Sequence, residues 1–256
     1  MIANFSQRLH ARSAAMLTTI EGGLSRIMIG WLVVAALACA LRVATSPLHG
    51  SVPATTVLPY MSLVLAPFGS MVLALRWFAD GDRLGQPVMR LARLGRWTNV
   101  SRETATRHTL YGTSGIMVSL LVGMLLSVPV RGAEYLASMP ALAGRVPPWL
   151  DTLHTLMTLD VVLLSSLYAI VFVAALRRVP LFPRLLVAIW MVDLTMQMII
   201  AYLVSGSEGV PASVAGPLQT LLDGNVKKVL ISVGLWLPYL LLSVRVNVTY
   251  RHRIPG

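Results

Sequence analysis

Two carboxylates lie within segments that are otherwise apolar and long enough to cross a membrane. Asp160 falls in segment 152–176 and Asp193 in segment 185–204. Ionised side chains are costly in hydrocarbon, and those found there commonly serve proton or ion movement. Trp190, Asp193 and Gln197 follow the i, i+3, i+7 spacing of one helix face, which we expect to point into the protein. These residues are the strongest candidates for chemistry.

Cations that could partner the two acids lie at Lys227 and Lys228, near the outer end of the last apolar segment. Two interpretations are open for this polar set. The carboxylates could bind a proton or a cation, or they could form hydrogen bonds and ion pairs that hold the helices together. Transporters commonly also show a discontinuous helix or a denser polar pathway. The sequence indicates neither, so we favour the structural interpretation.

Motifs for catalysis and metal binding are not recognisable in the sequence. No Gly-rich phosphate loop, nucleophile elbow or HExxH motif is present. A haem between His108 and His154 is the least excluded cofactor, but we expect these two residues near opposite membrane faces. We therefore predict no catalytic residue, no metal and no cofactor. The five histidines are scattered: His10, His49, His108, His154 and His252.

The composition is that of an integral membrane protein. Hydrophobic residues make up 56% of the chain and charged residues 12%, whereas soluble domains have about 25% charged residues. The mean hydropathy is +0.73. The single cysteine, Cys39, excludes an internal disulfide. The sequence thus predicts an all-α, integral membrane helical bundle.

Six apolar segments are long enough to span a bilayer, and together they form one transmembrane domain over 26–256, after an N-terminal segment 1–25. Of the 21 Lys and Arg residues, sixteen lie on the side of the N-terminus and five on the other. Positive charge marks the cytoplasmic side, so both termini are expected there. Residues 129–150 and 205–225 are expected to form outer loops. The predicted spans are 27–43, 57–78, 110–128, 152–176, 185–204 and 229–242.

The longest polar stretch is the basic loop 76–108, expected on the cytoplasmic side. Within it, residues 87–97 place Arg90, Arg93 and Arg96 on one arc of a helical wheel, with apolar side chains opposite. This pattern predicts an interfacial helix that binds lipid headgroups. A nucleic-acid site would need a cluster of stacking aromatics or a recognised fold, so we expect membrane lipids and no nucleic acid as partners.

Small residues repeat every four positions in two of the predicted spans. Gly115, Ser119, Gly123 and Ser127 form one stripe, and Ala36 and Ala40 belong to a shorter one in the first span. Small side chains on one helix face let another helix backbone approach closely. Both stripes are predicted to be helix-packing faces, within the bundle or against another subunit.

The C-terminal segment 235–253 carries the most distinctive motif, LWLPYLLLSVRVNVTYRHR. It resembles the ending of a bacterial inner-membrane family, Domain of Unknown Function 2569, as do LFPRL at 181–185 and Gly30-Trp31. The resemblance covers 149–251 and the first span. It implies a helical protein of the bacterial inner membrane and supplies no activity. The matching C-terminal residues are Trp236, Pro238, Tyr239, Ser243, Arg245, Val246, Thr249 and Tyr250.

The sequence therefore favours a non-catalytic, multi-pass protein of the bacterial inner membrane, an accessory or structural subunit of a larger membrane complex. Its expected partners are membrane lipids and other membrane protein subunits. The alternative is a proton- or cation-coupled transporter of a small solute that uses Asp160 and Asp193.

Overall fold

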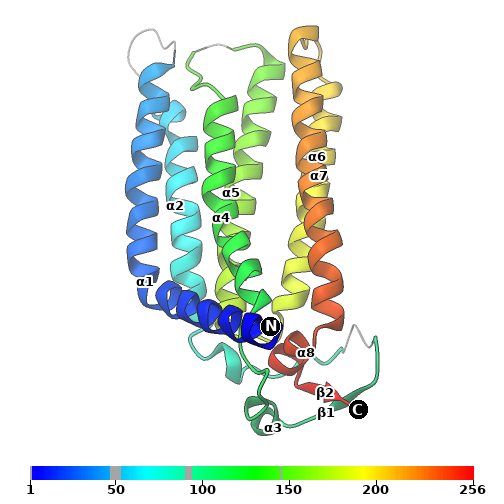
Figure 1. The fold of residues 1–256 in the computed structure, drawn as a ribbon. Helices are drawn as coiled ribbons and strands as arrows, with labels where there is room; N and C mark the ends of the chain where they lie inside the picture. The colour runs from blue at the N-terminus through cyan, green and yellow to red at the C-terminus, as the bar shows by residue number, and fades with distance from the viewer. Residues whose placement is uncertain (1, 47–52, 90–93, 145) are drawn as a thin grey trace.

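The computed structural model describes residues 2–46, 53–89, 94–144 and 146–256. Within this part of the chain, six helices are long and apolar enough to cross a membrane. They run side by side as a bundle, and both chain termini lie at the same end (Figure 1). The expected all-α bundle is thereby confirmed. The helices are α1 (Ile2–Thr45), α2 (Ala54–Trp77), α4 (Ile116–Ser138), α5 (Pro148–Leu176), α6 (Phe182–Ser205) and α7 (Ala212–Leu242).

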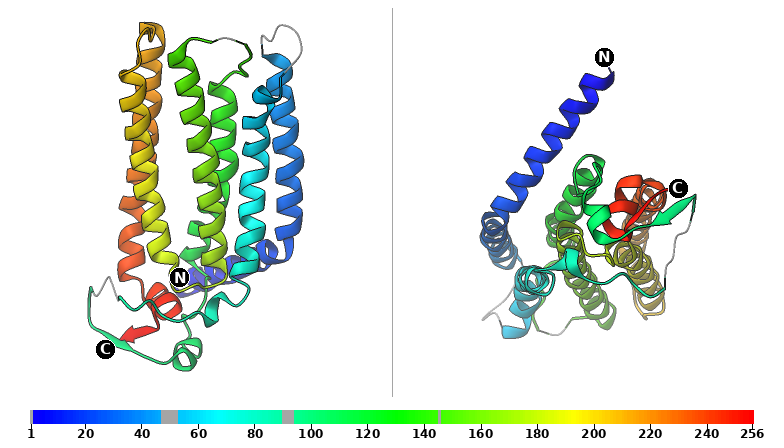
Figure 2. Two further views of the ribbon diagram at one scale, coloured as in Figure 1. Left: turned by 180° about the vertical axis from the view of Figure 1, so that it is seen from behind. Right: turned by 90° about the horizontal axis from the view of Figure 1, so that it is seen from below.

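Helix α5 is the centre of the bundle. Of the residues in its most apolar stretch, 67% are buried, whereas the corresponding share is 11% in α1 and in α7. It packs against α2, α4 and α6, whereas α7 packs mainly on α6. The end-on view shows α1 at the edge of the bundle, with its first part running outward beyond the other helices (Figure 2). Polar residues carried by α5 are therefore surrounded by protein on several sides.

Helix α4 differs from the predicted span 110–128 at both ends. Residues 110–115 form turns, in which Gly112 and Gly115 have φ angles of 107° and 72° that favour glycine. At the other end, the helix continues through Pro129 to Ser138. A proline interrupts a helix less readily in a membrane, where neighbouring groups can satisfy the backbone it frees. The outer loop predicted from residue 129 was thus placed too early, and Arg131 lies inside the helix.

Helix α7 also begins earlier than predicted. It starts at Ala212 and contains Pro217, so the outer loop expected over 205–225 shrinks to the few residues after α6. This extension brings Asn225 and Lys228 into a helix that lines cavities shared with α4. Lys228 was expected near the acids at the outer end of this span, whereas Asn225 was expected in the outer loop.

The prediction of an interfacial helix at 87–97 is wrong at both ends, which are the parts of this segment that the structure describes. Residues 87–89 and 94–96 are not helical, and Trp97–Asn99 forms strand β1, antiparallel to β2 (Arg253–Pro255). Gly95, at φ 95°, has a left-handed conformation that a helix cannot use. Residues 90–93 lie outside the described part of the chain. At the C-terminal end of this segment, pairing of Trp97 with the C-terminus thus takes the place of the expected helix.

A short helix, α8 (Val244–Arg251), joins the C-terminus to the end of the bundle. Tyr250 is fully buried, and its hydroxyl donates to the Ala175 carbonyl at 2.8 Å. Arg245 donates to Ser114 Oγ at 2.7 Å, and Thr249 Oγ1 accepts from Gly112 N at 2.9 Å. The polar residues of the C-terminal motif therefore attach α8 to α5 and to the turns before α4.

Candidate functional site

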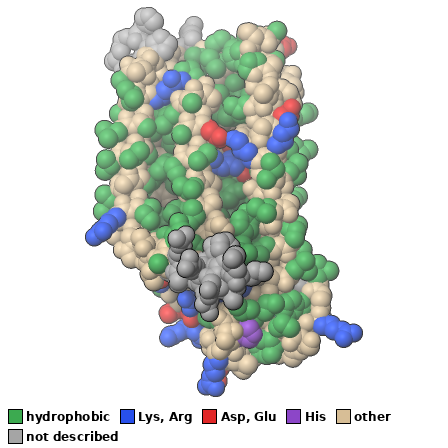
Figure 3. Space-filling view, in the orientation of Figure 1, with side chains coloured by type: hydrophobic (Ala, Val, Ile, Leu, Met, Phe, Trp, Pro, Cys, Tyr) green, Lys and Arg blue, Asp and Glu red, His purple; other side chains and the backbone are tan. Residues whose placement is uncertain are grey.

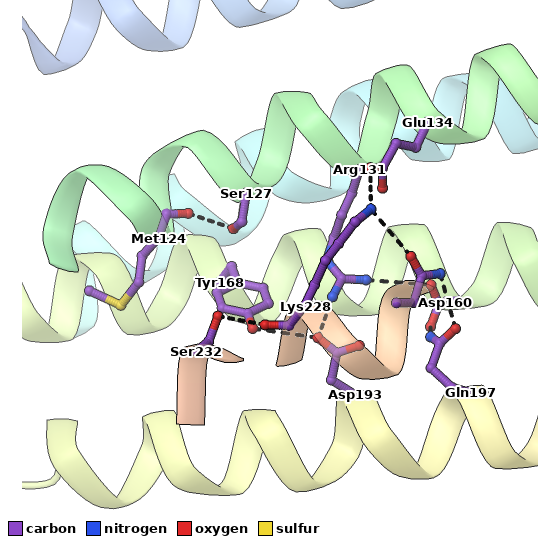
Figure 4. Close-up of polar contacts among 11 residues, drawn as sticks. Met124, Ser127, Arg131, Glu134, Asp160, Tyr168, Asp193, Gln197, Lys228 and Ser232 are labelled. Carbon is purple, nitrogen blue, oxygen red and sulfur yellow. Dashed lines mark hydrogen bonds and ion pairs between the residues drawn. The ribbon is translucent and has the colours of Figure 1, made fainter. Parts of the chain in front are cut away.

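Asp160 and Asp193 lie together, joined by Arg131, a residue that the sequence predicts in an outer loop. Arg131 of α4 forms an ion pair with Asp193 of α6 and lies with its Nη1 3.6 Å from Asp160 Oδ2 of α5 (Figure 4). The side chains are 17% exposed for Arg131, 8% for Asp160 and 0% for Asp193. Three helices thus meet at one buried charge cluster, with two carboxylates facing one guanidinium.

Polar side chains extend this cluster from α6 toward α7. Gln197 Nε2 donates to Asp160 Oδ1 at 3.0 Å, and Gln197 Oε1 accepts from Asn225 Nδ2 at 3.1 Å. The face that carries Trp190, Asp193 and Gln197 points inward, as predicted, and all three residues are buried. The amide of Gln197 therefore connects the carboxylate on α5 to α7.

Tyr168 of α5 lies on the other side of the cluster. Its hydroxyl donates to Asp193 Oδ2 at 3.5 Å, and its ring centroid is 5.6 Å from the Arg131 guanidinium carbon. The ring face thus offers a further weak interaction to the cation. Asp193 Oδ2 consequently has two partners, Arg131 and Tyr168.

The second oxygen of Asp193 is unsatisfied. Asp193 Oδ1 is buried and has no hydrogen-bond partner among the described residues. Buried polar atoms in folded proteins nearly always have a partner, and an exception needs an explanation. A carboxylate oxygen left open in a buried charged cluster is chemically suited to accept a proton or to coordinate a cation.

Two cavities adjoin the cluster, and both lie between α4 and α7. One has a volume of about 190 Å³ and is lined by Tyr168 and Asp193; the other, about 760 Å³, is lined by Tyr135 and Asp160. Four polar side chains line both cavities: Arg131, Glu134, Asn225 and Lys228. These four side chains thus form the common boundary of the two spaces, and Arg131 belongs both to this boundary and to the cluster.

A second ion pair bridges α4 and α7 at this boundary. Lys228 Nζ contacts Glu134 Oε1 and lies 3.5 Å from Asn225 Oδ1. The side chains of Lys228 and Glu134 are 60% and 46% exposed. In the space-filling view, acidic and basic atoms gather on a surface of the helical region that is otherwise largely apolar (Figure 3). The bridge therefore lies at the open edge of the cavities, whereas the Arg131 cluster lies behind it.

The structure unites some of the candidate residues and separates others. Asp160, Asp193, Gln197 and Lys228 belong to the cluster or its boundary, but Lys227 is exposed and lines neither cavity. Sequence reasoning missed the contributions of Arg131, Glu134, Tyr168 and Asn225. Residues 130–137 hold a usable signal, since apolar residues recur at helical spacing beyond Pro129.

The small-residue stripes do not pack as one internal helix interface. Gly115 is the N-cap of α4, Ser119 and Gly123 are exposed, and Ser127 is half-buried. Gly123 and Ser127 line the smaller cavity. Ala36 and Ala40 are exposed as well. Among the described residues, these faces remain open instead of being covered by a neighbouring helix.

The arginines expected to bind lipid headgroups are only partly described. Arg90 and Arg93 lie outside the described residues, and Arg96 is exposed. The carbonyl of Arg96 accepts from Gly256 N at 3.2 Å, next to the pairing of β1 with β2. Arg96 therefore belongs to the C-terminal sheet region and is not part of a helix.

Among the described His, Cys, Asp and Glu residues, no group of three is arranged to hold a metal ion. His154 contacts the Tyr135 hydroxyl at 3.3 Å, whereas His108 Nδ1 accepts from Leu110 N at 3.1 Å. The two histidines thus take part in separate local contacts.

No family model, curated protein or solved structure matches this chain. The function must therefore be inferred from the chemistry of the cluster and of the cavities beside it.

Proposed function

We propose that this protein is a proton- or cation-coupled transporter of a small solute, with Asp160 and Asp193 as the coupling carboxylates. The observation that carries this proposal is the pair of cavities lined by the same four side chains, Arg131, Glu134, Asn225 and Lys228. Intramembrane ionisable residues commonly mark ion pathways. Transporters that work by alternating access commonly hold substrate and coupling ion near the middle of the membrane, between helices that move against each other, and the shared side chains of α4 and α7 offer such a site.

The buried acids supply a means of coupling. A proton taken up by Asp193 neutralises the carboxylate and weakens its ion pair with Arg131. Arg131 is then freer to interact with a solute carboxylate or phosphate, or with Asp160 alone. Because α7 packs mainly on α6 and is joined to α4 by the Lys228–Glu134 pair, α7 is the element best placed to move.

The setting we propose is the bacterial inner membrane, with both termini cytoplasmic. The excess of Lys and Arg on the side of the termini supports this orientation.

Reconstitution into liposomes tests the proposal. Proteoliposomes are given a mixture of labelled amino acids, sugars and carboxylic acids, and uptake is measured with and without an imposed pH or sodium gradient. We expect at least one solute to accumulate with a gradient, and Asp193→Asn and Asp160→Asn to abolish this. Asp151→Asn, an exposed acid on the same helix as Asp160, is the matched control. Uptake that survives both cluster substitutions contradicts the proposed role of the acids.

A second candidate function is that of an accessory subunit. The exposed faces of α1 and α4, with Ala36, Ala40, Ser119 and Gly123, favour it, because small residues suit close contact with helices of another subunit. Purification in a mild detergent tests this candidate through stoichiometric co-purification of a partner. Loss of that partner on replacing Ala36 and Ala40 with Leu is the expected result.

A further inference from the structure

A second polar site lies at the end of the bundle that carries both termini, away from the intramembrane cluster. A cavity of about 360 Å³ opens there between α6 and α7. Its basic side chains come from three elements: Arg184 from the start of α6, Arg251 from the end of α8 and Arg253 from β2. The C-terminal residues thus complete a cavity that begins between two spans.

The positive charges in this cavity are close to one another. Arg184 donates to the Met89 carbonyl, and Arg251 donates to the Leu240 carbonyl at 2.7 Å and to Asn247 Oδ1 at 3.1 Å. These acceptors are neutral, so the bonds hold the guanidiniums in place without cancelling their charge. Burial, followed by the neighbouring Arg253 and Arg184, lowers the pKa of Arg251 to about 10. An anion between these side chains would relieve that repulsion.

The opposite wall of the cavity is apolar. Val187 and Ala188 of α6 face Leu237 and Leu241 of α7 across it. Arg184 lies in the first turn of α6 and Leu241 in the last turn of α7, so the cavity is at the depth where the spans end. Guanidiniums at the membrane boundary and aliphatic side chains above them match the two parts of a phospholipid, its phosphate and its acyl chain.

We propose that this cavity is a binding site for an anionic phospholipid. The phosphate lies among Arg184, Arg251 and Arg253, which suit the planar, bidentate recognition of phosphate oxygens. An acyl chain lies along Val187, Ala188, Leu237 and Leu241. Basic pockets between spans on the cytoplasmic side are a recurrent mode of anionic lipid recognition. This site does not depend on the proposed transport function.

The test measures binding of phosphatidylglycerol, phosphatidylcholine and inorganic phosphate to the purified full-length protein by native mass spectrometry. We expect phosphatidylglycerol to bind more tightly than phosphatidylcholine. Arg184→Gln and Arg251→Gln should each weaken phosphatidylglycerol binding by about fivefold, as expected for loss of one cation near a membrane surface. Arg83→Gln, an exposed arginine outside the cavity, should leave binding unchanged.

A second variant separates a lipid from a soluble phosphate. Ala188→Trp fills the apolar side of the cavity without altering its charge, so it should weaken phosphatidylglycerol binding and leave the binding of inorganic phosphate unchanged. Displacement of phosphatidylglycerol by micromolar inorganic phosphate, or unaltered lipid binding by Ala188→Trp, would overturn the proposal. Equal binding of the two lipids by the wild-type protein would also overturn it. If Arg251→Gln does not fold, because Arg251 also bonds the Leu240 carbonyl, Arg184→Gln decides the outcome.

Discussion

Arg131 and Asp193 are 62 positions apart in the chain, on α4 and α6, and their side chains form an ion pair in the interior of the bundle. Asp160 lies on the other side of the same guanidinium. One cation thus stabilises carboxylates from two further helices. Removing it would leave two buried negative charges without their main partner.

Arg131→Gln should therefore strongly destabilise the protein. Breaking a buried ion pair by removing one partner costs about 3–5 kcal/mol, because the remaining charge stays buried and uncompensated. The measurement is the thermal unfolding temperature in detergent. The triple variant Arg131→Gln, Asp160→Asn, Asp193→Asn should recover much of the loss, since it leaves no unpaired charge. A triple variant as unstable as Arg131→Gln would show that the charges are not the cause.

The Lys228–Glu134 pair should contribute little to stability but should constrain movement of α7. Both side chains are about half exposed, and such pairs contribute about 0–1 kcal/mol at a solvated surface. We expect the free energy of unfolding of Glu134→Gln to lie within about 1 kcal/mol of the wild-type value. If α7 moves during transport, joining Glu134→Cys to Lys228→Cys with a bifunctional thiol reagent should block uptake.

The same double variant without the reagent is the control for this experiment. The native Cys39 is buried and should not react at the same rate. Full uptake by the cross-linked protein would contradict a transport cycle that separates α4 from α7.

Tyr250→Phe should loosen the attachment of α8. The hydroxyl of Tyr250 donates to the Ala175 carbonyl at 2.8 Å, and burial, with a smaller effect of Tyr239, raises its pKa, so it remains a protonated donor. Losing this bond should cost about 1–2 kcal/mol, because the substitution leaves a buried carbonyl without that donor. Hydrogen exchange of the amides of α8 should accelerate, with exchange in α2 unaffected. Equal acceleration in both helices would indicate global destabilisation instead.

Acid should destabilise the C-terminal region formed by α8 and β2, through His252. Burial, followed by the charge of Arg102, lowers the pKa of His252, so the folded state holds the neutral imidazole. The unfolded chain takes up a proton as the pH falls through about 6.5. The contribution of His252 to the free energy of unfolding is therefore fully present above that pH and declines below it. The unfolding temperature should fall between about pH 7.5 and pH 5.5.

His252→Asn is the control for the pH dependence. His252 has φ 48°, a left-handed conformation that asparagine tolerates, and asparagine does not titrate. The variant should show a shallower decline over the same range. Identical pH profiles for the two proteins would assign the decline to other groups.

Hydropathy was sufficient to predict six spans. A chain that crosses lipid must hydrogen-bond its own backbone as a helix, so each span is visible in the sequence as one long apolar segment. Spans 152–176 and 185–204 agree closely with α5 and α6. The ends near Pro129 and Pro217 were misplaced, since a proline is a strong helix terminator in water and a weaker one inside a membrane bundle. The residues at those two ends, Arg131 and Lys228, are the ones that complete the candidate site.

Sequence by itself determined the membrane class, the number of spans and the inward face of Trp190, Asp193 and Gln197, because these depend on composition and on helical period. Tertiary structure decided which charges meet. The ion pairs of Arg131 and Lys228, and the pairing of β1 with β2, join residues far apart in the chain. Local patterns specify what each segment can bury, but only the packing of one helix against another specifies which buried groups face each other.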